Sequence, residues 1–274
     1  MRQARIGGIP NDQDQEKTSG QDLPGDQKGK TKTQGSFKEI LGKVTRNQHQ
    51  GEFASPCITI DWLLLKPLRS EKQFNFCGHS ILITQHHGSN LGFSASIWEA
   101  ALVLCQYFER EKIDFLGKKV IELGSGTGLV GILAALLGGD VTLTDRENVL
   151  SQIQYNVSIN IPSDSKHRSK VCPLSWGKDH VHFPMDYDFI LGSDIVYTSL
   201  TYPLLLKTLH HLSKGSTIIY LSSKLRKGNH SVSFHEELLP QYYNCQRVHL
   251  VESKAINVYK ISSIKPAASD DVTA

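Results

Sequence analysis

The residues most suited to chemistry form a glycine-rich run from Val120 to Gly128, with the sequence VIELGSGTG. The apolar start of the run predicts a buried strand, and its glycines predict a tight turn that leads into a helix near Thr127. Backbone N–H groups point outward at such a helix start, and the helix dipole favours a negative group there. Glycine also lets a ligand approach the backbone where a Cβ atom would collide. The run therefore predicts a ligand-binding turn.

Polar and aromatic side chains follow the next strands at the same end of the predicted sheet. Asp145 ends the second strand, where a carboxylate can take both hydroxyls of a ribose. Trp176 follows the third strand, where an indole can flank an adenine ring. Ser193 and Asp194 end the fourth strand, and Tyr197 follows within a turn. The alternatives are that each carboxylate only caps a helix and that the indole is ordinary core.

Two classes of cofactor fit this glycine turn. The GxGxxG pattern from Gly126 to Gly131, with Asp145 further on, matches the dinucleotide fingerprint, so an NAD-dependent oxidoreductase is one alternative. The turn starts earlier than that fingerprint requires, at Gly124. In addition, Glu122 at the end of the strand is unfavourable beside a pyrophosphate and suits a cofactor with positive charge. S-adenosylmethionine carries a sulfonium and an ammonium and has no phosphate.

Strands and helices must alternate along the chain to position these residues. Apolar strands are expected at 120–123, 141–144, 171–174, 189–192 and 217–221, and helices at 129–137, 148–159, 202–212 and 234–239. Near-continuous apolar strands separated by helices indicate a mostly parallel sheet covered on both faces. Two closing strands at 247–251 and 256–261 predict an antiparallel hairpin at one edge. The expected fold is α/β, a doubly wound, Rossmann-like sheet of seven strands.

An N-terminal extension precedes this sheet. Strands are expected at 58–63, 73–76 and 80–84, with a hairpin through Gly78, and a helix is expected from Ser96 to about Glu111. Residues 1–56 are rich in polar side chains and hold too few apolar ones to offset chain entropy. We therefore expect disordered tails at 1–56 and 265–274 and one folded domain over 57–264.

Composition narrows the classes of partner. The net charge is +3, and residues 1–50 hold nine Lys or Arg against six Asp or Glu, so the remainder of the chain is neutral. A neutral body disfavours direct nucleic-acid binding. The five cysteines are widely spaced, which argues against disulfides and a metal site and favours the cytosol or the nucleus; we expect the cytoplasm. No apolar run approaches the roughly 20 residues of a membrane span, so we expect no membrane contact. We also expect the protein to be a monomer.

The ordered motifs resemble those of the seven-strand S-adenosylmethionine-dependent methyltransferases. The segment from Glu122 to Gly128 resembles their motif I, and the segment from Asp194 to Tyr197 resembles the Asp-x-x-Tyr signature of the protein-lysine methyltransferase branch. The blocks at 97–101 and 174–177 resemble other motifs of that branch, and the blocks at 117–120, 138–141 and 222–227 bring the chain close to the elongation factor 1A lysine methyltransferases. The resemblance covers about 74–261. Ser125 and Ser193 depart from it, because alanine is expected at both positions.

The resemblance implies S-adenosylmethionine-dependent methyl transfer to a lysine ε-amine of a protein, elongation factor 1A. It makes 57–264 a methyltransferase domain and implies a role for each motif residue. The methionine part of the cofactor would lie over Gly124, Ser125 and Gly126, and Glu122 belongs to the same motif. The ribose would be held by Asp145. The adenosine side would be lined by Trp176 and Ser193, and Trp98 would close the pocket. Asp194 and Tyr197 are the expected catalytic residues, with Asp194 orienting the incoming amine rather than taking its proton. A methyltransferase-fold protein that binds partners without catalysis is a further alternative.

Overall fold

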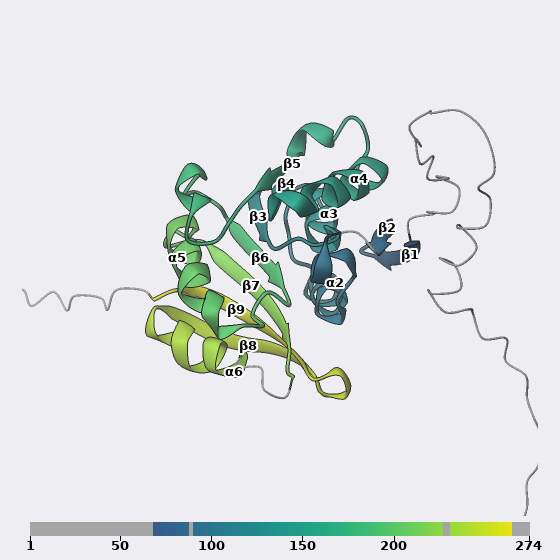
Figure 1. Ribbon diagram of the computed structural model, residues 1–274. Coiled ribbons are helices and arrows are strands. Elements are labelled where there is room, and N and C mark those ends of the chain that lie inside the picture. Colours follow the sequence, from purple (N-terminus) through teal and green to yellow (C-terminus); the bar gives the residue numbers. More distant parts are fainter. Residues whose placement is uncertain (1–67, 88–89, 227–230, 265–274) are drawn as a thin grey trace, which may run out of the picture. The chain divides into compact units, whose positions relative to one another are not determined.

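The computed structural model describes residues 68–87, 90–226 and 231–264 (Figure 1). The expected tails at 1–56 and 265–274 and the expected strand at 58–63 lie outside the described residues. Those expectations therefore stay predictions.

Seven strands form one mixed sheet in the order β5-β4-β3-β6-β7-β9-β8 (Figure 1). They are β3 (Lys119–Leu123), β4 (Asp140–Asp145), β5 (Ser169–Pro173), β6 (Phe189–Ser193), β7 (Ile218–Lys224), β8 (Tyr243–Val251) and β9 (Ile256–Ser263). The first five pair in parallel, and β9 runs antiparallel to both β7 and β8. The predicted doubly wound sheet with an antiparallel edge is thus confirmed. Strand β8 starts at Tyr243, earlier than the expected Arg247.

Two apolar cores lie on opposite faces of the sheet, because side chains alternate along each strand. Helices α2 (Glu99–Glu111), α3 (Leu129–Leu136) and α4 (Leu150–Asn160) share one core with Val120 of β3. Helix α5 (Tyr202–Leu212) shares the other core with Ile121 and Leu123 of the same strand. Burying each such side chain contributes about 1.5–3 kcal/mol. In the described part of the chain no helix is long and apolar enough to cross a bilayer.

The helix expected at 234–239 takes a different form. A π-helical turn, Phe234–Leu238, lies between the short helix α6 (Ser231–Ser233) and a 3-10 turn, Leu239–Gln241. Pro240 supplies the physical reason. Proline has no N–H to donate to the carbonyl four residues earlier, and its ring clashes with that carbonyl, so a regular α-helix cannot continue through this point.

The expected N-terminal hairpin is present, formed by β1 (Leu68–Phe76) and β2 (His79–His87). Its turn residues Cys77 and Gly78 both have positive φ, 52° and 79°. A two-residue turn of this kind has a backbone twist that matches the right-handed twist of the two strands.

An amide ladder fixes this hairpin on α4. Side-chain oxygens of Gln152, Asn156 and Asn160 accept the backbone N–H groups of His86, Thr84 and Leu82 at 3.0, 2.9 and 2.8 Å. A spacing of four residues puts the amides on one face of the helix, and alternate strand residues face them. The helix therefore stands beside β2 where another strand would pair.

Candidate active site

The glycine turn connects β3 to α3 at the point where the strand order reverses, between β3 and β6. Ligands bind at such a point in open α/β sheets. Gly124 and Gly126 have φ of 63° and 57°, in the left-handed region that glycine adopts without strain. A Cβ atom at Gly124 would lie 2.8 Å from Cγ2 of Ile195 and 3.4 Å from Cζ2 of Trp176. The turn thus packs directly on the segments that follow β6 and β5.

Asp145 is placed to hold the turn and has lone pairs left for a ligand. Its Oδ2 accepts the N–H of Gly126 at 2.9 Å, and its Oδ1 accepts the N–H of Arg146 at 2.7 Å. The residue is 7% exposed, and burial raises the pKa of its carboxyl. A carboxylate offers about four lone-pair sites, so two stay available for a ribose.

Ser125 locks the other side of the turn to β4. Its backbone N–H donates to the carbonyl of Thr144 at 2.9 Å, and its Oγ accepts the N–H of Thr144 at 3.1 Å. The hydroxyl therefore accepts a hydrogen bond that the alanine expected at this position could not accept.

Glu122 belongs to β3, and its side chain is buried against α3. Its Oε2 accepts the N–H of Gly131 at 3.1 Å. Burial raises the pKa of its carboxyl to about 8, against the opposing hydrogen bonds from Ser125 and Gly131. The group is therefore largely protonated at pH 7, and its hydrogen bonds hold the turn against α3. Its contact with a cofactor stays a prediction.

Gly131 is the glycine that the packing of α3 on β3 requires. A Cβ atom there would lie 2.5 Å from Oε2 of Glu122 and 2.7 Å from Cδ2 of Leu143. Gly131→Ala should therefore destabilise the fold by about 1–3 kcal/mol, despite the better helix propensity of alanine. Urea unfolding at pH 7 measures this effect. Gly215→Ala is the matched control, since nothing lies within 4 Å of its Cβ position; equal stability of the two variants would contradict the packing argument.

Asp194 is fixed in an uncommon backbone conformation directly after β6. Its φ is 55°, which costs free energy for a residue other than glycine and recurs at functional sites. Its N–H donates to the carbonyl of Ser222 at 2.7 Å. Its carboxylate accepts two hydrogen bonds from the guanidinium of Arg226, at 2.9 and 2.5 Å, and one from the N–H of Lys224 at 3.1 Å. The side chain is only 4% exposed.

An aromatic rim, defined as Phe93, Trp98 and Tyr197, lies beside this carboxylate. The Phe93 ring stands edge-on to the rings of Trp98 and Tyr197, with centroids 6.1 and 6.3 Å apart. The indole N–H of Trp98 donates to the carbonyl of Phe93 at 2.9 Å. The guanidinium of Arg226 lies 5.3 Å from the centroid of the Trp98 ring, within cation–π range. The structure therefore brings Trp98, Asp194 and Tyr197 into one cluster.

Gln152 connects the aromatic rim to the glycine turn. Its amide nitrogen donates to the carbonyl of Ser94 at 2.7 Å and to the carbonyl of Gly126 at 3.1 Å. Ser94 belongs to the 3-10 turn Gly92–Ala95, which also holds Phe93. One buried side chain thus fixes the spacing of two segments of the site.

Ser193 ends β6 opposite Ser222 of β7 and is half-buried. Sequence reasoning missed three site residues: Phe93, Gln152 and Arg226. Only Arg226 could have been found from the sequence. It follows the apolar strand β7, whose carboxyl end reaches the same edge of the sheet as Asp194.

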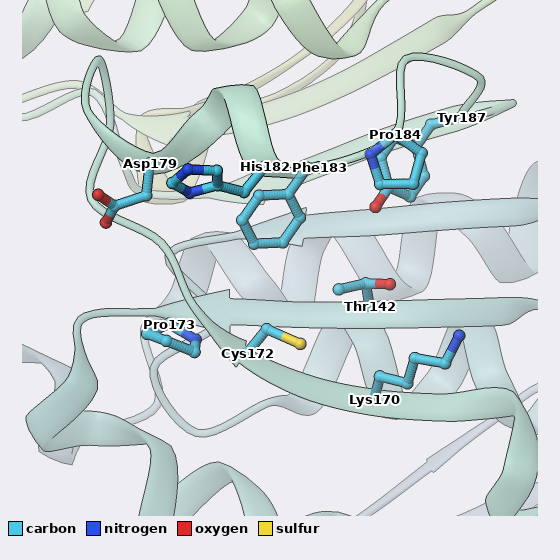
Figure 2. Close-up of a pocket in the computed structure, with 9 residues that line it drawn as sticks. All are labelled: Thr142, Lys170, Cys172, Pro173, Asp179, His182, Phe183, Pro184 and Tyr187. Atoms are coloured by element: carbon cyan, nitrogen blue, oxygen red, sulfur yellow. The ribbon is translucent and has the colours of Figure 1, made fainter.

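A separate cavity of about 480 Å³ lies beside β4 and β5 (Figure 2). Figure 2 shows Thr142, Cys172 and Lys170 on these strands, facing His182 and Phe183 at the end of the 3-10 turn Asp179–His182. None of the residues that line it belongs to the predicted site. Within the described ranges, no cluster of His, Cys, Asp and Glu side chains is arranged to hold a metal ion.

The fold is similar to that of a solved methyltransferase. A 16S rRNA N2 methyltransferase of T. thermophilus, solved in complex with AdoMet and guanosine, superposes with a TM-score of 0.55 at 14% identity. The match covers 72% of this chain and 51% of that chain. At this identity the likeness shows the fold alone.

Sequence comparisons identify the family. The family model for lysine methyltransferases matches residues 77–239. EEF1A lysine methyltransferase 3 of Xenopus tropicalis is 54% identical over 192 residues, which cover 70% of this chain and 85% of the relative. The protein of the same name from Mus musculus is 52% identical, with 69% and 80% covered. Protein N-lysine methyltransferase METTL21A of Danio rerio is 44% identical, with 72% and 89% covered. The chain therefore belongs to the lysine methyltransferase family, as its motifs predict.

Proposed function

We propose that this enzyme transfers a methyl group from S-adenosylmethionine to a lysine ε-amine of elongation factor 1A. The observation that carries the choice of substrate is the identity above 50% to two relatives named EEF1A lysine methyltransferase 3. METTL21A of Xenopus tropicalis is also 52% identical, but over 157 residues against 188 and 192 for those two relatives, and METTL21A of Danio rerio is 44% identical over 198 residues. The site residues supply the remaining support.

The glycine turn suits a cofactor without phosphate. In a dinucleotide site the N–H groups of the turn face a pyrophosphate. Here the N–H of Gly126 is taken by the carboxylate of Asp145, and an anion at this place repels a pyrophosphate. This contact disfavours the NAD-dependent alternative. In our proposal Gly124, Ser125 and Gly126 hold the methionine part, Asp145 holds the ribose, and Trp176 and Ser193 line the adenosine side.

The acceptor must arrive as a neutral amine. A lysine with its usual pKa of about 10.4 is neutral in roughly one molecule in a few thousand at pH 7. When S-adenosylmethionine is bound, it supplies a methyl group that the nitrogen lone pair takes as the C–S bond breaks, leaving that bond's electron pair on sulfur. Asp194 and Tyr197 would orient the amine, and Trp98 would exclude water, which together reduce the entropy cost of alignment. The lysine loses one proton to solvent before the transfer, and the methylated product leaves as a protonated secondary amine.

Asp145→Asn tests the cofactor assignment. The variant keeps one acceptor oxygen but loses the charge, and a hydrogen bond to a charged group contributes roughly 1.5–3 kcal/mol. We therefore expect the Kd for S-adenosylmethionine to rise about 10- to 100-fold by calorimetry. Asp140→Asn, at the exposed start of the same strand, should leave that Kd unchanged. An unchanged Kd for S-adenosylmethionine in the Asp145 variant would contradict the assignment of Asp145 to the ribose.

The proposed activity is tested by incubating the full chain with purified elongation factor 1A and S-adenosylmethionine labelled in the methyl group. Label should appear on one or more lysines of the substrate, located by mass spectrometry. Binding of the cofactor without transfer, to this substrate or to proteins of a cell extract, would favour the non-catalytic alternative. Methyl transfer to a different protein would support the proposed reaction and show that elongation factor 1A is not the substrate.

We also propose that the enzyme acts as a monomer in the cytoplasm. All cysteines of the described part, Cys77, Cys105, Cys172 and Cys245, are free thiols, which suits a reducing compartment. Light scattering of the purified protein and fluorescence microscopy of a tagged chain test the two statements separately.

A further inference from the structure

Asp194 is held in a two-pronged ion pair with Arg226. Two guanidinium nitrogens bond the two carboxylate oxygens separately, a geometry that gives strong, oriented hydrogen bonds. The pair raises the pKa of Arg226, first through the hydrogen bond to Asp194. The arginine side chain is 34% exposed, whereas the carboxylate side chain that it pairs with is 4% exposed. It also lies over the ring of Trp98, at the aromatic rim through which a lysine would approach.

Three other charged groups act on or near this pair, Glu99, Lys224 and Lys254. Glu99 of α2 acts on Arg226 but is itself paired with Lys224 at the end of β7, which lowers the pKa of Glu99. Lys254 adds a weaker attraction to Glu99. Loss of Arg226 would therefore leave the Asp194 carboxylate without a cationic partner, with the N–H of Lys224 as its remaining hydrogen-bond donor.

An unpaired carboxylate at this place would oppose the reaction. An opposite charge within about 4–6 Å stabilises the charged form of a lysine and raises its pKa by about 1–3 units. The lysine would then be held as an ammonium ion, which has no lone pair to attack a methyl group. The same carboxylate, once neutralised by an arginine that cannot lose its proton, can still accept a hydrogen bond from a neutral amine.

We propose that Arg226 is a positioning residue that neutralises Asp194, so that the acceptor lysine reaches the site as a neutral amine and is not trapped as an ammonium ion. This inference rests on the proposed function and adds to it the control of the protonation state of the substrate. Arg226 acts through Asp194 and takes no part in bond making.

The test compares Arg226→Gln with the wild-type chain, using elongation factor 1A as substrate. At pH 7, kcat should fall about 10-fold, and the acid limb of the kcat–pH profile should move about one unit toward higher pH. With S-adenosylhomocysteine in place of the methyl donor, calorimetry should show substrate affinity at least equal to that of the wild type. In buffers of different ionisation enthalpy, fewer protons should be released per substrate bound, because the lysine keeps its proton.

Two further variants separate charge from structure. Arg226→Lys keeps the positive charge, so proton release and the pH profile should stay near those of the wild type. Arg247→Gln removes an exposed arginine that pairs with Glu236 at 3.5 Å on another part of the fold, and all readouts should stay unchanged. The inference would be overturned if Arg226→Gln bound the substrate more weakly, released as many protons as the wild type and lost kcat equally at every pH. Arg226 would then have a structural role only.

Failure of the inference can be distinguished from failure of the proposed function. If the wild-type chain neither binds nor methylates elongation factor 1A, the proposed substrate is wrong, and the Arg226 comparison is made with the protein that is labelled in cell extract. If the wild type methylates its substrate and Arg226→Gln matches it in proton release and pH profile, only the role of Arg226 is wrong.

Discussion

Replacing Asp194 with asparagine should reduce methyl-transfer turnover on the order of 100-fold, the cost of misplacing a reacting group by about 1 Å. Asparagine keeps the shape of the side chain and tolerates the left-handed backbone at this position, φ 55°. It loses one of the two acceptors that Arg226 bonds, so the geometry of the amine site changes while the fold persists. Turnover on the protein substrate and the Kd for S-adenosylmethionine are measured separately, and the Kd should change little.

Asp186→Asn is a suitable control for this variant, because Asp186 forms a surface ion pair with Lys119 away from the site. The double variant Asp194→Asn, Arg226→Gln extends the test. Residues that act as a unit show non-additive losses, so the double variant should lose about as much turnover as Asp194→Asn alone. Full turnover by Asp194→Asn would exclude a catalytic role for the carboxylate, and additive losses would mean that the two side chains act independently.

Replacing Glu122 with glutamine should stabilise the protein at pH 7 by up to about 3 kcal/mol, since each pKa unit corresponds to about 1.4 kcal/mol. The pKa of Glu122 is about 8 in the folded chain, against 4.5 for an ordinary glutamate. Between these values the unfolded chain loses a proton that the folded chain keeps. Stability therefore falls as pH rises from about 4.5 to about 8, and the amide, which cannot ionise, removes this contribution.

Urea unfolding of both proteins at pH 5 and pH 8 measures the effect. The free-energy difference between variant and wild type should be small at pH 5 and largest at pH 8. Glu147→Gln, on an exposed turn before α4, should show no such dependence. A variant that is equally or less stable than the wild type at pH 8 would contradict the buried, protonated state of Glu122. Cofactor affinity of the Glu122 variant would then show whether the carboxyl also serves binding.

The fold could be predicted from the chain because each strand and helix carries its own local signal. Apolar runs such as 189–192 mark strands that are covered on both faces, and the glycine pair after α3 marks a helix end. The π-helical turn at Phe234–Leu238 could not be predicted in the same way, because its cause is a single proline acting on hydrogen bonds one turn away.

The candidate site could be predicted only where its residues follow strand ends. Asp145 and Asp194 are visible in the sequence for that reason, whereas Gln152 lies in the first turn of α4 and cannot be distinguished in the sequence from an exposed glutamine. The ion pair of Asp194 and Arg226 joins residues 32 positions apart. It forms because β6 and β7 pair in a register that sets Ser193 beside Ser222. The sequence of one strand alone does not determine its pairing register with another strand.

The amide ladder on α4 has a consequence for how the protein behaves at high concentration. An unpaired strand edge is a template on which a second chain can add, and proteins avoid aggregation by covering or interrupting such edges. Strand β2 has β1 on one side and amides on the other, and Asn156 and Asn160 also donate back to the carbonyls of Thr84 and Leu82 at 3.0 and 2.8 Å. The helix thus completes the hydrogen bonding of these strand residues without presenting a new edge, because a side-chain amide cannot extend a sheet.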